Sequence, residues 1–77
     1  MTATFYLAAP TGERWTARAG QLLVGRAVRY GKVGKVGTVE RTVPVSAGRT
    51  LRVHVALSRK VANPDRHKFR LAPEAAS

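Results

Sequence analysis

Apolar and polar residues alternate with a period of two in three stretches of the chain. From Leu51 to Leu57 every odd-numbered residue is a leucine or a valine, and the residues between them are Arg, His and Ala. From Val39 to Val45 the odd-numbered positions, Arg41 included, are expected to share one face, with threonine and glutamate opposite. A less regular alternation runs from Leu22 to Tyr30 and is interrupted by Arg26. Because side chains of a strand point alternately to the two faces of a sheet, these stretches predict half-buried antiparallel strands.

Glycine, proline and asparagine separate these stretches at spacings of about 8–15 residues, as expected for short strands joined by turns. Pro44 has no backbone N–H to donate to a ladder, so it marks an edge, a bulge or a strand end. The Asn63-Pro64-Asp65 turn favours a short helical or 3₁₀ segment before the last strand. The predicted strands are Thr4–Ala8, Arg14–Arg18, Leu22–Arg29, Gly37–Val45, Thr50–Ser58 and His67–Leu71.

We therefore predict an all-β fold, a small antiparallel β-barrel of five to six short strands with at most one short helix. So short a chain cannot bury two full sheets, and closing one sheet removes the exposed edges that invite aggregation. Phe5 and Phe69 are expected to fill the core, and Trp15 to cover it from an early hairpin. The domain should span residues 1–72, followed by a flexible tail at 73–77. The residues expected to be largely buried are Val39, Val43, Val53, Val55 and Phe69.

The segment most suggestive of a function lies between Arg29 and Arg41 and reads R-Y-G-K-V-G-K-V-G-T-V-E-R. Glycine recurs in it at every third position, with lysines in between. Since glycine permits a positive φ or a close approach of two backbones, Lys32 and Lys35 are expected where the backbone is most accessible. A basic, glycine-lined turn suits an anionic polymer. A glycine-rich hairpin with solvated lysines would have the same sequence.

The charge of the whole chain favours an anionic partner. Fourteen Lys and Arg stand against four Asp and Glu, which gives a net charge of +10 and a pI near 11.7. Such an excess opposes compaction, and nucleic acid is the commonest partner of a small basic domain. An anionic membrane surface usually requires a basic amphipathic helix, and the sequence contains none, so no membrane partner is predicted. The alternative is that the charge provides only solubility.

A second basic cluster surrounds the Asn63-Pro64-Asp65 turn, where arginine side chains could bind phosphates through bidentate forks. Its alternative interpretation is a charged, solvated loop. Tyr30 lies beside the glycine–lysine turn and could stack on a base or pack over the mouth of the barrel. The predicted nucleic-acid-binding residues are Arg29, Tyr30, Lys32, Lys35, Arg59, Lys60, Arg66, Lys68 and Arg70.

The sequence argues against an enzyme, a metal site or a cofactor. There are no cysteines, His54 and His67 have twelve residues between them, and the four carboxylates are scattered. These residues do not form a zinc ligand set or an acid–base pair, and neither a phosphate-binding loop nor a nucleophile elbow is present. The absence of cysteine and of a long apolar run predicts a cytoplasmic protein. Many Ala, Arg, Val and Gly with no Ile indicate a GC-rich genome, such as that of an actinobacterium or its phages.

Residues Gly20–Val39 resemble the KOW motif of SH3-like barrels, in which a strand leads into a glycine–lysine turn and then into alternating valines. Gly31–Val36 matches the core of that motif, and Lys35–Val39 matches it one register later. Thr50–Leu57 looks like the valine-rich strand that follows, and Phe69–Pro73 like the short closing strand. The connection from Ser58 to His67 and the preceding Phe5–Arg18 segment depart from the pattern. The resemblance implies an SH3-like barrel that contacts RNA or RNA polymerase.

These observations predict a nucleic-acid-binding module, with RNA or a complex associated with the ribosome or RNA polymerase as the favoured partner. The alternative is a small, phage-encoded interaction or assembly protein whose basic face docks on an acidic partner protein. Exposed strand edges could also support self-association. Groove geometry and 2′-OH contacts distinguish RNA from DNA, so the sequence leaves both open.

Overall fold

The computed structural model describes residues 1–73 and consists mainly of one antiparallel sheet. Five strands lie in the order β1-β4-β3-β2-β5, and within the described residues no helix is long and apolar enough to cross a membrane. The expected tail falls largely on residues 74–77, outside the described part. The elements are β1 (Thr2–Ala8), α1 (Ala17–Gln21), β2 (Ala27–Tyr30), β3 (Gly34–Val45), β4 (Thr50–Leu57), η1 (Arg66–Lys68) and β5 (Phe69–Leu71).

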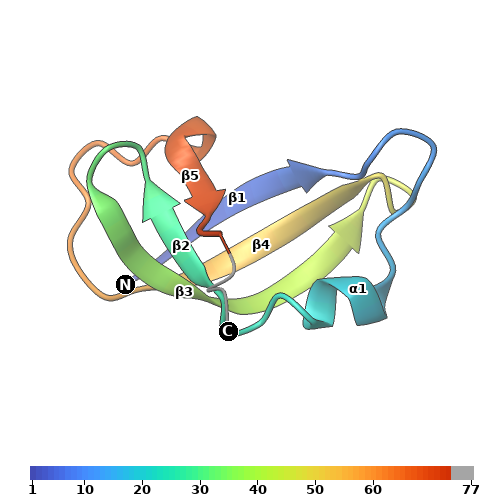
Figure 1. The fold of residues 1–77 in the computed structure, drawn as a ribbon, viewed down its shortest axis with the longest axis horizontal. Coiled ribbons are helices and arrows are strands. Elements are labelled where there is room, and N and C mark those ends of the chain that lie inside the picture. Colours follow the sequence, from blue (N-terminus) through green and yellow to red (C-terminus); the bar gives the residue numbers. More distant parts are fainter. Residues whose placement is uncertain (74–77) are drawn as a thin grey trace.

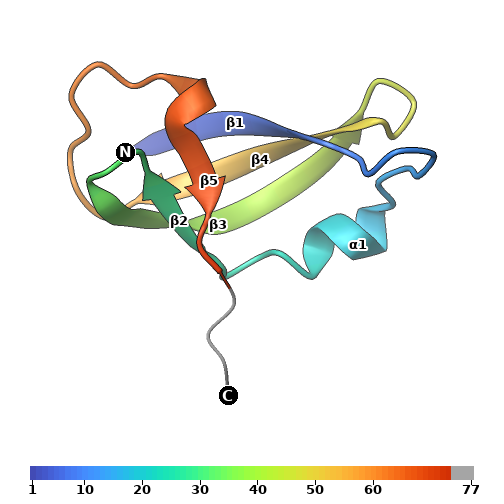
Figure 2. The ribbon, with the colours of Figure 1, turned by 45° about the horizontal axis from the view of Figure 1, so that its top comes forward.

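The sheet is strongly curled, so that its two edges approach each other (Figures 1 and 2). β5 pairs only with β2 and forms one edge, and β1 pairs only with β4 and forms the other. The 3₁₀ turn η1, directly before β5, packs against β1. α1 lies on β3 at the far end of the sheet. This arrangement confirms the prediction of an all-β, barrel-like fold.

Two of the six predicted strands are wrong in whole or in part. Arg14–Arg18 is not a strand, because Thr16 caps the short helix α1 by accepting a hydrogen bond from Ala19 N at 3.0 Å. Alanine and arginine are good helix formers once such a cap satisfies a free N–H. Of the predicted strand Leu22–Arg29, only the end belongs to β2, which begins at Ala27. The preceding residues form successive turns, and Leu22 is 75% exposed.

The other strands agree with the prediction apart from their ends. β3 begins at Gly34, three residues earlier than expected, and β4 ends at Leu57. β5 is shorter than the predicted His67–Leu71, because its first residues belong to η1. The 3₁₀ turn is capped by Asp65, whose carboxylate accepts from His67 N at 2.9 Å. A short helical segment after Asn63-Pro64-Asp65 was expected, and η1 confirms it.

A β-bulge in β3 overturns the expectation that Val39, Arg41, Val43 and Val45 share a face. The register with β4 shifts between Val39 and Arg41, so that Val39 pairs with Val55 but Arg41 pairs with His54. The extra residue reverses the alternation beyond it. Val43 therefore points outward opposite Arg52 and is only half-buried, in contrast to the prediction. Thr42 takes the inner position opposite Val53.

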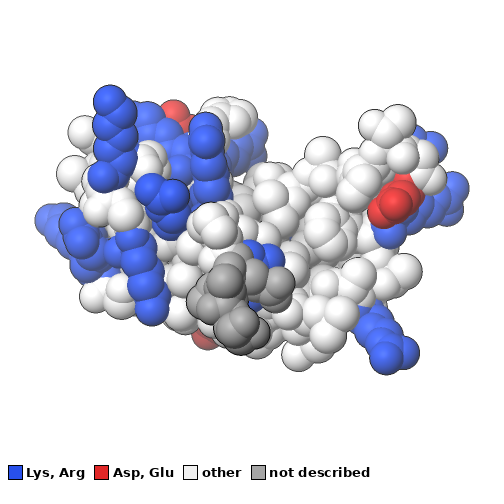
Figure 3. Space-filling model, viewed as in Figure 1, with Lys and Arg blue, Asp and Glu red and all other residues white. Residues whose placement is uncertain are grey.

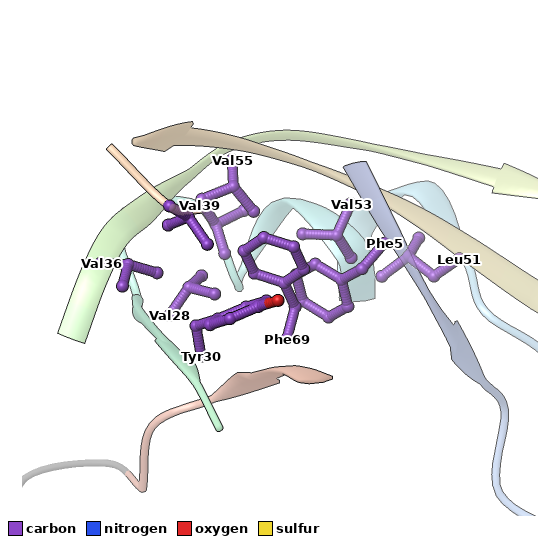
Figure 4. Packing of buried hydrophobic residues seen from close by; sticks show 10 residues of the cluster. Phe5, Val28, Tyr30, Val36, Val39, Leu51, Val53, Val55 and Phe69 are labelled. Carbon is purple, nitrogen blue, oxygen red and sulfur yellow. The ribbon is translucent and has the colours of Figure 1, made fainter. Parts of the chain in front are cut away.

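The core lies in the concavity of the sheet and is built largely from valines and aromatic rings (Figure 4). Phe69 stacks on Phe5 with ring centroids 6.1 Å apart and meets the edge of Tyr30 at 4.8 Å. Trp15 is half-buried and packs against this cluster, as expected for a residue that covers the core. The core residues are Phe5, Val28, Tyr30, Val36, Val39, Leu51, Val53, Val55, Val61 and Phe69.

Substitution Val53→Asp is expected to unfold the domain. Val53 has no exposed surface, and an unpaired buried carboxylate costs several kcal/mol, against a total stability of about 5–15 kcal/mol for a small domain. The matched control is Val33→Asp, because Val33 is 50% exposed at a turn. Far-UV circular dichroism and thermal melting should show a folded V33D and an unfolded V53D. A cooperative melt of V53D near that of the parent would contradict this core.

Candidate nucleic-acid interface

The glycine–lysine segment forms the β2–β3 hairpin. Gly31 and Gly34 have φ of +51° and +96°, so both occupy the left-handed region that L side chains rarely adopt. Val33 N donates to Tyr30 O at 2.9 Å and closes the turn, with Lys32 exposed at its tip. Gly37 has a different role, which is to allow close backbone approach: a Cβ at this position would collide with the backbone carbonyl of Ala56 in β4. Positive φ and close backbone approach, the two expected roles of glycine, are both present.

Three cationic residues form a row across the outer face of β3, β2 and β5. Arg29 of β2 is in register with Lys35 of β3 on one side and with Arg70 of β5 on the other. All three are exposed. Residues directly opposite on neighbouring strands point to the same face and lie about 4.5–5.5 Å apart at Cβ. The fold therefore gathers charges that are up to 41 positions apart in the sequence, and we name Lys35, Arg29 and Arg70 the cationic row.

Further predicted residues extend this positive surface. Gly31 N donates to Lys68 O at 2.9 Å, which places exposed Lys68 beside the glycine–lysine turn. Figure 3 shows Lys and Arg gathered over the end of the molecule that carries β2, β5 and the β2–β3 turn. Arg29 and Arg70 also border a shallow hollow of about 230 Å³, which Gly31, Leu71 and Pro73 complete. None of these lining residues is acidic.

Arg59 and Lys60 lie in the long loop after β4, at the same end of the molecule (Figures 1 and 2). Ser58 anchors the start of the loop, since its N and Oγ both donate to Val36 O, at 2.8 and 3.1 Å. Val61 is buried in the core and holds the loop further along. Between these two anchors, Arg59 and Lys60 are exposed to solvent.

Tyr30 belongs to the core and is not available to stack on a base. The side chain is 6% exposed, its ring contacts Phe69, and its hydroxyl donates to Asn63 O at 2.9 Å. The tyrosine thereby ties the loop after β4 to β2. Of the two roles considered from the sequence, the structure supports packing, because alternation along β2 turns residue 30 inward while Arg29 faces solvent.

Arg66 is separated from the cationic row and lies on the β1 side of the molecule. Its guanidinium is 5.3 Å from the centroid of the Tyr6 ring, a cation–π contact. The sequence alone gives no reason to assign Tyr6 a function, because this residue lies within the short apolar run Phe5–Ala9. Only its 43% exposure, on the opposite side of β1 from Phe5, distinguishes it.

Within the described residues, no cluster of three or more His, Cys, Asp or Glu side chains is placed to hold a metal ion. His54 lies on the outer face of β4, in register with Thr4 of β1 and Arg41 of β3. Its Nδ1 is 3.5 Å from Thr4 Oγ1, and its Nε2 is buried with no described hydrogen-bond partner. Burial lowers the pKa of His54 below 6.5, and Arg41 and Arg52 lower it further, although Glu40 opposes this effect.

The lowered pKa of His54 predicts that stability falls on mild acidification. As pH drops through 6.5, the unfolded chain takes up the proton before the folded chain does, so the free energy of unfolding decreases below that pH and is unaffected well above it. Urea unfolding at about pH 7.5 and about pH 5.5 measures this difference, since carboxylates remain ionised over that window. His54→Gln should flatten the dependence. An equal loss of stability in parent and variant would assign the effect to other groups.

Comparisons with protein-family models, with curated proteins and with solved structures gave no match. The resemblance of Gly31–Val36 to the KOW motif accordingly stays a prediction made from the sequence.

Proposed function

We propose that the protein is a nucleic-acid-binding module that holds phosphates on the face carrying the cationic row. The observation that carries the proposal is the register of Lys35, Arg29 and Arg70 on three adjacent strands. RNA, in a ribosome- or polymerase-associated complex, is the partner we favour, in agreement with the KOW-like turn at Gly31–Val36, and the cytoplasm is the location we propose.

The energetics of the row support an anionic ligand. Like charges directly opposite on neighbouring strands destabilise a sheet, and here two such pairs share Arg29. A phosphate between them converts this repulsion into attraction. Arg29 and Arg70 can each present a planar fork of donors to phosphate oxygens, whereas Lys35 contributes a compact charge. Lys32 and Lys68 beside the row can contact neighbouring phosphates, so that a polymer would be bound better than a single anion.

The affinity for nucleic acid is expected to fall steeply with salt. If roughly four to six phosphates are neutralised, the slope of log K against log salt is about −3 to −5, because each contact releases condensed counterions. Fluorescence anisotropy with labelled RNA and DNA oligonucleotides at several salt concentrations measures this slope. The double variant Lys35→Glu with Arg70→Glu should bind at least about tenfold more weakly, with a slope shallower by about two.

The matched control is Arg14→Glu with Arg18→Glu. These arginines are exposed near α1, at the other end of the molecule, and the two double variants have the same net charge. The control should keep most of the affinity if the contact surface is the cationic row. Equal losses in both would mean that only net charge matters. If the folded parent binds no RNA or DNA at low salt but binds an acidic protein, the assembly-protein alternative replaces this proposal.

A further inference from the structure

A hollow of about 450 Å³ lies between β1, the β3–β4 hairpin and the segment η1–β5, and Val45 and Phe69 form part of its lining. Tyr6 lines it together with Thr50 and Ser46 from the β3–β4 hairpin, and Arg66 and His67 of η1 form the other wall. The volume falls within the range of about 300–1,000 Å³ that is usual for small-molecule sites. The hollow therefore has room for a group the size of a nucleobase.

Tyr6 lies outside the core, on the outer face of β1. Phe5 and Leu7 on either side of it point inward, and Tyr6 shares the outer face with its cross-strand partner Arg52. Its ring is 43% exposed and carries the Arg66 guanidinium 5.3 Å from its centroid. An aromatic ring next to a planar guanidinium is a combination on which unpaired bases stack.

Val45 and Phe69 give the hollow an apolar part, and three other lining residues suit the polar edge of a base. Thr50 and Ser46 carry hydroxyls that can donate or accept, and the His67 imidazole adds further hydrogen-bonding capacity. No carboxylate lines the hollow, which disfavours a cationic ligand and permits the approach of a phosphate.

One short segment connects this hollow to the cationic row. Arg66, Lys68 and Arg70 alternate along η1 and β5 and are all exposed. Arg66 lies at Tyr6, Lys68 is bound through its carbonyl to the glycine–lysine turn, and Arg70 is part of the row. A nucleic-acid backbone that follows this segment would bring an unpaired base to Tyr6. The bases of a double helix are paired and stacked, so they could not reach Tyr6 in this way.

From this geometry we infer that the hollow at Tyr6 and Arg66 is a nucleobase-stacking site, and that the ligand class is single-stranded nucleic acid. The inference rests on the proposed function, since it requires a phosphate backbone on the basic face. The stacking site would distinguish a strand that carries an unpaired base from one that does not. The cationic row contacts phosphates and cannot make this distinction.

The experiment compares a labelled single-stranded RNA octamer with an abasic strand of the same length and charge, by fluorescence anisotropy at one salt concentration. The parent should prefer the base-containing strand by about 5- to 150-fold, as expected for ~1–3 kcal/mol from one stacked base. Tyr6→Ala should abolish this preference, and Tyr6→Phe should keep it. Arg66→Lys should retain binding of the abasic strand but reduce the preference, because the charge stays while the planar group is lost.

The outcomes separate this inference from the proposed function. Equal binding of both strands by the parent, or an unchanged preference in a folded Y6A, overturns the stacking site and leaves the phosphate surface intact. No binding of either strand by the parent overturns both. Thermal melts identify an unfolded variant. If Y6A does not fold, the parent's preference and the R66K comparison decide the matter.

Discussion

The insertion of Phe69 between Phe5 and Tyr30 is the contact on which the rest of the structure depends. Phe5 comes from one edge strand of the sheet and Tyr30 from β2, so that Phe69 on β5 joins the two edges around one aromatic cluster. Such pairs contribute about 0.5–1.5 kcal/mol beyond the burial of their area. The cluster thereby covers part of the apolar concave face of the sheet.

The same packing positions the candidate interface. Since Phe69 is held in the core, Arg70 next to it must face solvent opposite Arg29, and η1 just before it is brought against β1. The Tyr30 hydroxyl adds a bond to Asn63 in the loop before η1. The segment from Asn63 to Arg70 is therefore fixed at both of its ends. This gives its cationic residues defined places on the surface. Along β2 and β5, aromatic residues of the core therefore stand next to basic residues of the surface.

The glycines allow this small sheet to bend without losing its pairing. Gly37 lets β3 and β4 approach more closely than a Cβ would permit, and the bulge between Val39 and Arg41 exchanges the faces of the strand beyond it. Such bulges increase the local twist. Lys35 lies on the basic face at the start of β3, and Thr42 lies close to Gly20 of α1 near its end.

The sequence alone was sufficient to predict the all-β class, the strands β1, β3 and β4, the 3₁₀ turn after Asp65 and the burial of Phe5 and Phe69. Period-two alternation and turn residues are local signals, and each of these features depends on them. The sequence also identified the basic residues, because charge is a property of composition.

Only the tertiary structure decided which of those charges lie together. The row of Lys35, Arg29 and Arg70 exists because of strand register, which a bulge can shift by one residue. The helix at Ala17–Gln21 depends on a single cap and on packing against β3, which outweigh a weak strand pattern. Tyr30 and Tyr6 are both strand tyrosines, yet the ring of Tyr30 is buried and that of Tyr6 is exposed beside Arg66. Exposure is a property of the folded chain, since it depends on which residues distant in the sequence cover each side chain.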